Sequence, residues 1–130
     1  MQKKPEYSDV VADIMRELSS KIVKLQAAGV KDLIFDPGFG LGKTVEHNFE
    51  MLERLRDFSI TGLPILVGVS RKTMIWKTLS ITPEEALNGT TVLNTVALLN
   101  GADILRVHDV KEAVQAVRLI TKLRNVKTTG

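Results

Sequence analysis

Side chains that could do chemistry gather at the ends of three short apolar segments of this sequence. In chain order they are Asp36, then Ser70, Arg71 and Lys72, and then Arg106, His108 and Asp109. Apolar segments that end in polar residues are typical of buried parallel strands, and the carboxyl ends of such strands carry the binding sites of α/β proteins. The pattern therefore predicts one site, built from a carboxylate and several cations.

Asp36 is followed by glycines at positions 38, 40 and 42, which let the backbone turn sharply and approach another group closely. An ionised carboxylate accepts two parallel hydrogen bonds from an edge of N–H and NH₂ groups, as in a guanidine-like heterocycle. A strand-to-helix connection that Asp36 merely caps or braces is the alternative. Three glycines beside a strand-end carboxylate and Lys43 favour a binding site.

The two cationic clusters indicate an anion. Arg71 and Lys72 precede a short helix, a position that favours negative charge, although an isolated lysine is more often a solvated surface group. Arg106 and His108 are two residues apart, so a strand places them on the same side. Together they suit a phosphate or a pyrophosphate. His47 has no such context and is expected at the surface.

The elements that position these groups follow from hydrophobic periodicity. Apolar residues at spacings of three and four predict helices from Pro5 to Ala28, after Thr44 and after Asp109, whose side chain is expected to cap the last helix. Thr82-Pro83-Glu84-Glu85 predicts the start of a helix that continues past Gly89 to Gly101. Gly89 inside this helix costs about 1 kcal/mol against alanine, which close packing against a neighbouring backbone would explain. Strands are expected near residues 32–36, 64–69 and 103–108.

The order is one helix followed by three strand–helix units, with strand starts about 30 to 40 residues apart, as in βαβ units. Polar groups only at the carboxyl ends of the strands are typical of a TIM barrel. A complete barrel takes about 250 residues, and this chain has 130. We therefore predict an α/β fold in which residues 1–130 form one partial domain, the C-terminal portion of a TIM (β/α)₈ barrel. A small doubly wound open sheet is the alternative.

Composition excludes several classes of function. The net charge of +3, with a single Trp and a single Tyr, gives no basic, aromatic face for nucleic acid. The absence of cysteine excludes disulfides and thiolate metal sites. No apolar run has membrane-spanning length and no signal peptide opens the chain, so we expect no membrane association and a cytoplasmic location.

Three motifs, in this order and at this spacing, resemble those of the dihydropteroate synthase family. They are Asp36-Pro37-Gly38-Phe39-Gly40-Leu41-Gly42-Lys43, Val67-Gly68-Val69-Ser70-Arg71-Lys72-Thr73-Met74-Ile75 and Ile104-Leu105-Arg106-Val107-His108-Asp109-Val110. The resemblance covers nearly the whole chain. It implies a TIM barrel that joins dihydropterin-6-ylmethyl diphosphate to 4-aminobenzoate in folate biosynthesis, giving dihydropteroate and pyrophosphate, with magnesium.

The resemblance also implies roles for single residues. Asp36 corresponds to the carboxylate that holds the amino-pyrimidine edge of the pterin. Lys72 corresponds to the lysine that hydrogen-bonds the pterin and borders the aminobenzoate site, and Arg106 and His108 to the pair that binds the diphosphate; these three carry the catalytic roles. The aminobenzoate pocket is shaped by the loops that contain Phe39, Gly40, Leu41, Ser70, Arg71 and Thr73.

The chain departs from the usual family pattern in a few places. Leu41 stands where a second Phe is common, Thr73 replaces a frequent Ser, and Trp76 stands where a Gly is common. The magnesium-contacting Asn of the family has no counterpart here, so the magnesium ligand is expected in an N-terminal half that this sequence lacks. The isolated chain is accordingly expected to be inactive and to form homo-oligomers.

Three other interpretations fit parts of the sequence. Gly42-Lys43-Thr44 matches the end of a phosphate-binding loop, but Pro37 stands where the first glycine of that motif belongs. A pterin-binding methyltransferase domain would share the barrel and the strand-end carboxylate, yet a methyl transfer needs no diphosphate site. A catalytically dead fragment that persists as an oligomer is the third.

Overall fold

The computed structural model of the chain describes residues 9–40 and 42–126. Helices dominate it, and two of them are short 3₁₀ helices, η1 and η2. In chain order the elements are α1 (Val10–Ala27), α2 (Val45–Glu53), η1 (Leu55–Thr61), β1 (Leu66–Val67), α3 (Thr73–Leu79), η2 (Pro83–Glu85), α4 (Leu87–Leu99), β2 (Ile104–Leu105) and α5 (Val110–Arg124).

Three parallel segments lie side by side at the centre of the fold. β1 pairs with β2 in the register Leu66 to Ile104 and Val67 to Leu105, and Phe35 forms a parallel bridge to Ile65 on the other side of β1. The predicted parallel strands are therefore confirmed, but they are shorter than expected. The segment near 32–36 contributes only that bridge, with Phe35 donating to Pro64 O and accepting from Leu66 N.

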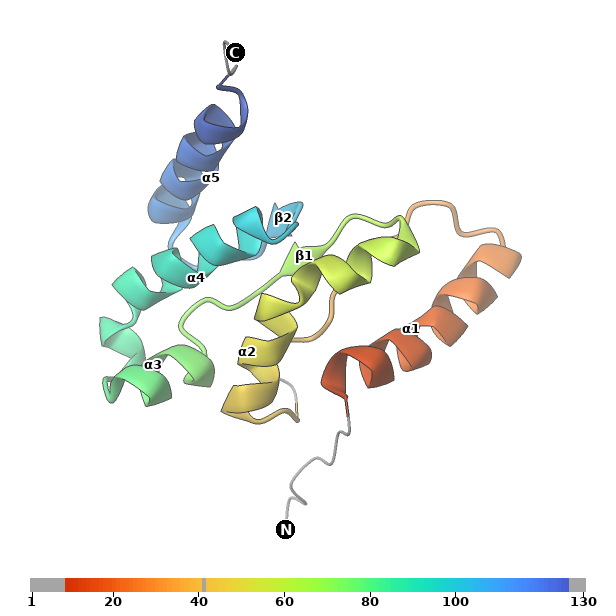
Figure 1. Cartoon of the computed structure of the whole chain (residues 1–130), viewed down its shortest axis with the longest axis horizontal. Coiled ribbons are helices and arrows are strands. Elements are labelled where there is room, and N and C mark those ends of the chain that lie inside the picture. The colour runs from red at the N-terminus through yellow and green to blue at the C-terminus, as the bar shows by residue number, and fades with distance from the viewer. Residues whose placement is uncertain (1–8, 41, 127–130) are drawn as a thin grey trace.

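The helices form an arc around these segments. α1 contacts α2, α2 contacts α3, α3 contacts α4 and α4 contacts α5, so the row runs from α1 at one end to α5 at the other (Figure 1). This is the arrangement of strand–helix units in the outer ring of a barrel. Within residues 9–40 and 42–126, three such units follow α1, as the sequence predicts.

The main core lies between α1, α2, η1, α3 and β1. Its largest fully buried side chains include Phe39, Phe58, Met51 and Leu55, and the rings of Phe35 and Phe58 pack with their centroids 5.1 Å apart. A separate small cluster joins α4 to α5 through Leu98, Ala116 and Ile120. These contacts fix β1 and its flanking loops, and with them the residues at the carboxyl ends of the strands.

Several local predictions are confirmed and others need correction. Thr44 caps α2, and Thr82 with Glu85 forms a capping box, although it begins the 3₁₀ turn η2 rather than α4 itself. Asp109 occupies the position before α5, but its side chain makes no capping hydrogen bond because it pairs with Arg71. Pro5, the expected start of the first helix, lies outside the described residues; Asp9 caps α1.

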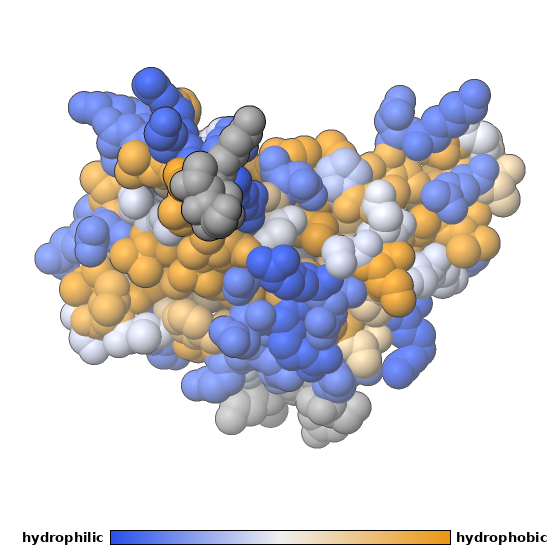
Figure 2. Space-filling view, turned by 45° about the horizontal axis from the view of Figure 1, so that its top comes forward, coloured by the Kyte–Doolittle hydropathy of each residue, from blue (hydrophilic) through white to orange (hydrophobic). Residues whose placement is uncertain are grey.

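The outer surface of α5 is rich in exposed apolar residues. They are Val110, Val114, Val117, Leu119 and Leu123. Figure 2 shows that apolar side chains also cover large parts of one face of the molecule, between groups of charged ones. No helix in the described part of the chain combines the length and the apolarity that a membrane span requires.

Candidate active site

The glycine-rich loop that follows Phe35 has a defined conformation. Gly38 N donates to Asp36 Oδ1 over 2.9 Å, and Gly40 has a φ of 88°, which favours a residue without a side chain. The buried Asn48 holds the loop from α2, because its Oδ1 accepts from Gly40 N at 2.7 Å and its Nδ2 donates to Thr44 O at 2.8 Å. The loop is thereby tied both to its own carboxylate and to the following helix.

His47 belongs to the same connection and is only partly exposed, so its expected surface position is wrong in part. It occupies the third position of α2, where its N donates to Thr44 Oγ1 and its Nδ1 accepts from Thr44 N. These two hydrogen bonds form a capping box, which satisfies donors that would otherwise be unpaired at the helix start. His47 thus helps to set where α2 begins.

Two lysines border the loop. Lys72 Nζ donates to Phe39 O over 2.8 Å and Lys43 Nζ to Gly38 O over 2.7 Å. Burial lowers the pKa of both ammonium groups from their ordinary values. For Lys72, the nearby positive charge of Arg106 lowers the pKa further. A bound anion would relieve this repulsion, so the two lysines indicate a site for negative charge.

Asp36 and Arg106 come together across the three parallel segments. Arg106 Nη2 lies 3.6 Å from Asp36 Oδ2, and its guanidinium lies over Gly68, where a Cβ would come within 3.1 Å of Nη2. The side chain of Arg106 remains 65% exposed and that of Asp36 36%. Both are therefore accessible to a ligand, and Gly68 provides the space in which the guanidinium lies.

His108 lies close to the same edge. Its N donates to Ser70 Oγ over 3.2 Å, which ties the end of β2 to the loop after β1. A small hollow of about 90 Å³ is lined by Gly68, Ser70, Lys72, Arg106, Val107 and His108. The structure thus brings together the three residues predicted to be catalytic, Lys72, Arg106 and His108.

Arg71 differs from the prediction. Its backbone has a φ of 52°, and its guanidinium makes a double hydrogen bond to Asp109, with Nε to Oδ2 and Nη2 to Oδ1 both at 3.0 Å. Its Nη1 donates to the carbonyls of Pro83 and Glu84. Arg71 therefore joins the loop after β1 to η2 and α5, and its guanidinium binds the Asp109 carboxylate rather than pointing towards the hollow near Arg106 and His108.

The pairing of Arg71 with Asp109 also has an electrostatic consequence. The hydrogen bonds from Arg71 lower the pKa of the Asp109 carboxyl, and those to Asp109 raise the pKa of the Arg71 guanidinium. Both groups are thus stabilised in their charged forms. The anion-binding part of the prediction then rests on Lys72, Arg106 and His108.

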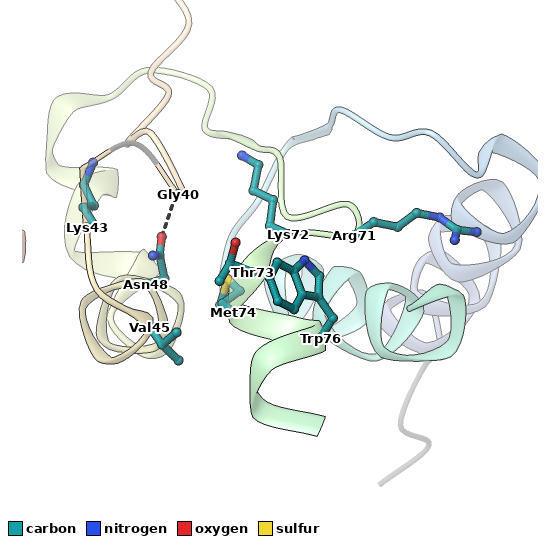
Figure 3. A pocket seen from close by; sticks show the side chains of 9 residues that line it. All are labelled: Gly40, Lys43, Val45, Asn48, Arg71, Lys72, Thr73, Met74 and Trp76. Carbon is teal, nitrogen blue, oxygen red and sulfur yellow. Dashed lines mark hydrogen bonds between the residues drawn. The ribbon is translucent and has the colours of Figure 1, made fainter. Parts of the chain in front are cut away.

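A larger pocket, of about 250 Å³, opens between the glycine-rich loop, the start of α2 and the start of α3. It is lined by Gly40, Lys43, Val45, Asn48, Arg71, Lys72, Thr73, Met74 and Trp76 (Figure 3). Figure 3 shows the Arg71 side chain directed away from Lys72. Gly40, Arg71, Lys72 and Thr73 therefore line the predicted pocket, although the Arg71 guanidinium binds Asp109. Ser70 lines the smaller hollow instead, and Phe39 contributes its carbonyl and keeps its ring in the core. Leu41 lies outside the described residues.

Sequence reasoning did not assign Lys43, Val45, Asn48, Met74 or Trp76 to the pocket. Trp76 lies one helical turn after Thr73, and residues at that spacing share a helix face. Helical spacing from a predicted site residue was thus a signal for Trp76, but it does not show which helix face meets the loop. Asn48 lies at no such spacing from a predicted site residue, so the sequence offered no comparable signal for it.

The residues at this site suit an anion better than a metal ion. In residues 9–40 and 42–126, no three His, Cys, Asp or Glu side chains come together as a possible metal site. Asp36, which comes from the strand end, already accepts from Gly38 N and faces Arg106. The described residues at this site therefore do not fit magnesium.

Fold and site together define a portion of an α/β barrel with a carboxylate and an anion-binding pocket at the carboxyl ends of its strands. The family model of the pterin binding enzymes matches residues 1–108. The chain therefore belongs to the pterin binding enzyme family. This excludes the phosphate-loop interpretation of Gly42-Lys43-Thr44.

Named relatives agree with this assignment. The dihydropteroate synthase of Escherichia coli K12 is 43% identical over 129 residues, which are 98% of this chain and 46% of that protein. The Xanthomonas albilineans dihydropteroate synthase with 7,8-dihydropteroate has a TM-score of 0.91 and 35% identity, with 98% of this chain and 51% of that one covered. The structure of the same enzyme with 4-aminobenzoic acid has a TM-score of 0.91 and 35% identity, with 95% of this chain and 46% of that one covered.

The similarity is to part of these proteins. The chain spans about half the length of the relatives it matches. The expected partial TIM barrel is thereby confirmed, and among the interpretations of the sequence the resemblance to dihydropteroate synthase is the one supported.

Proposed function

We propose that the protein to which this chain belongs condenses dihydropterin-6-ylmethyl diphosphate with 4-aminobenzoate. The observation that carries the proposal is the row formed by Asp36, Gly68 and Arg106 across three parallel segments, with Lys72 and His108 beside it. A carboxylate at one end suits a donor-rich heterocycle, and cations at the other suit a diphosphate. The relatives solved with 7,8-dihydropteroate and with 4-aminobenzoic acid support this choice of substrates.

In this reaction the bond between the pterin methylene carbon and the diphosphate oxygen breaks, and its electron pair leaves with pyrophosphate. The amine nitrogen of 4-aminobenzoate forms the new bond to carbon and loses a proton. Arg106 and His108 would stabilise the charge that develops on the leaving group, because donors placed before the reaction need no reorganisation. Lys72 lies between this hollow and the larger pocket, since it lines both.

Asp36 has the capacity to bind the pterin in addition to its present contacts. Its Oδ1 accepts one hydrogen bond from Gly38 N, and its Oδ2 lies 3.6 Å from Arg106. A carboxylate has about four acceptor sites, so positions for the amino-pyrimidine edge of the pterin remain. When pterin binds, we expect Asp36 to keep its contact with the loop and to accept two further hydrogen bonds.

Calorimetry with a pterin analogue tests the role of Asp36. The Asp36→Asn variant should bind more weakly by about 1–3 kcal/mol, because an amide must present a donor to a donor-rich edge. Asp32→Asn is the matched control, since Asp32 is exposed and outside both pockets. Unchanged affinity in Asp36→Asn would mean that Asp36 only braces the loop.

The 130-residue chain by itself is proposed to be inactive and to self-associate. Exposed apolar residues on α5 and at the strand segments, such as Leu119 at 71% and Ile34 at 57% exposure, favour contact with another chain. Among the described residues no further strand pairs with the outer edges of the three segments, and open edges pair readily. Light scattering and an assay of pyrophosphate release with both substrates would test this; an active monomer would contradict both parts.

Two further expectations belong to the proposal. Magnesium is expected as a cofactor of the reaction, with ligands other than the residues described here. A cytoplasmic location is expected from composition. Fractionation of cells that express the natural gene would test the location, and the dependence of pyrophosphate release on added magnesium would test the metal.

A further inference from the structure

Trp76 is the feature of the larger pocket that neither the sequence motifs nor the proposed reaction explains. It lies on α3, one turn after Thr73 and two residues after Met74, and all three line the pocket (Figure 3). The side chain is partly buried and packs against the main core. It is also the single tryptophan of the chain.

The pocket combines two kinds of lining. Lys43 and Lys72 carry ammonium groups that hydrogen-bond to the carbonyls of the glycine-rich loop. Val45, Met74 and Trp76 provide apolar surface in the same pocket. Two cations beside an apolar wall suit a ligand that is both negatively charged and flat, such as an aromatic carboxylate.

We propose that Trp76 is a specificity-determining residue that supplies the aromatic wall of this pocket and selects an aromatic carboxylate over an aliphatic one. The inference rests on the proposed function for the identity of that carboxylate, 4-aminobenzoate. The indole presents a large, rigid surface whose position is set by packing on α3, so an arene ring gains contact with it at little cost in side-chain entropy.

The arrangement also explains why the residue is large. A pocket of about 250 Å³ is small for a drug-sized ligand but suits a single substituted ring. A residue with no side chain at position 76 would leave this part of the pocket open to solvent. Trp76 therefore narrows the pocket at the start of α3, next to Lys72.

The test uses the single indole N–H signal of the ¹⁵N-labelled chain. The wild-type chain is titrated with 4-aminobenzoate, with cyclohexanecarboxylate as the non-aromatic control and with pyrophosphate as a ligand of the Arg106 and His108 hollow. The expected result is a saturable shift of the indole signal with 4-aminobenzoate and a smaller or absent one with the other two. Calorimetry supplies the affinities.

Two variants separate specificity from stability. Trp76→Gly should weaken 4-aminobenzoate roughly three- to tenfold, the range expected for one aromatic contact, and leave the affinity for pyrophosphate and for cyclohexanecarboxylate within about twofold. Trp76→Phe should recover most of the loss, because it restores an aromatic face. Retained pyrophosphate binding shows that the Gly variant is folded.

Each contrary result overturns the inference. These results are unchanged 4-aminobenzoate affinity in Trp76→Gly, an equal loss for all three ligands, and absence of 4-aminobenzoate binding to the wild-type chain. The proposed reaction is tested separately, by pyrophosphate release from a protein in which this chain is joined to the rest of a barrel. If the indole of the chain responds selectively but that protein releases no pyrophosphate with both substrates, the reaction is wrong and the role of Trp76 stands.

Discussion

Asn48 on α2 fixes the glycine-rich loop by hydrogen bonds, and replacing it by alanine should destabilise the chain. The amide is 3% exposed. It accepts from Gly40 N at 2.7 Å and donates to Thr44 O at 2.8 Å. Both distances are those of good hydrogen bonds, so Asn48→Ala removes two of them.

The magnitude follows from these two bonds. A neutral hydrogen bond contributes about 1 kcal/mol net, and a group left unsatisfied costs more only where it is buried. Because Gly40 is exposed and Thr44 partly so, water can hydrate both groups after the change. We therefore expect the free energy of unfolding to fall by about 2 kcal/mol.

Urea unfolding followed by far-UV circular dichroism measures the change in the free energy of unfolding. Glu46→Ala is the matched control, since Glu46 is exposed on the same helix, and it should change this free energy by less than about 0.5 kcal/mol. The released loop should also weaken 4-aminobenzoate binding, because Phe39 O would no longer hold Lys72 in place. A loss below about 0.5 kcal/mol in Asn48→Ala, with unchanged binding, would refute the reasoning.

Three further predictions follow from close contacts. Gly68→Ala should keep the free energy of unfolding within about 0.5 kcal/mol but weaken pyrophosphate binding in calorimetry, because the new Cβ would lie 3.1 Å from Arg106 Nη2; unchanged affinity would contradict it. Arg71 lowers the pKa of the Asp109 carboxyl in the folded chain, so their pairing stabilises the chain at pH values above the unfolded-state pKa of about 4. This stability is lost as the pH falls through the lower folded-state pKa, and the Tm difference between wild type and Asp109→Asn should therefore shrink in acid. A Tm difference that stays constant with pH would argue against the pair. Gly89→Ala should lower the free energy of unfolding in urea by about 1 kcal/mol. The new Cβ would lie 2.5 Å from a side-chain atom of α3, and overpacking of about 2 kcal/mol outweighs a gain in helix propensity of about 1 kcal/mol. A stabilised variant would show that α3 moves to accommodate the methyl group.

Much of the fold could be predicted because it depends on local properties of the chain. Short continuous apolar runs, each followed by an amphipathic segment, indicated three parallel strands followed by helices, and the structure has them in that order. The sequence also shows which residue types follow each strand. Because parallel strands bring their carboxyl ends to one edge, Asp36, Lys72, Arg106 and His108 were expected together before any contact was known.

Gly89 illustrates the limit of local reasoning within a helix. Its cost in helix stability was evident from the sequence, and close packing against a neighbouring backbone was the expected reason. The contact is instead with the side chains of Ile75 and Leu79 on α3. The partner of a helix face depends on how two helices pack, which the sequence of one helix does not contain.

Only the tertiary structure decided what the individual side chains of the site do. Arg71 pairs with Asp109, 38 residues away, because its backbone adopts a φ of 52° and α5 begins nearby. Phe39 turns its ring into the core, and Trp76 becomes a wall of the pocket. The sequence by itself determined which residues reach the strand ends, since that follows from periodicity; the direction of each side chain depends on partners from distant elements, and these meet only when the chain has folded.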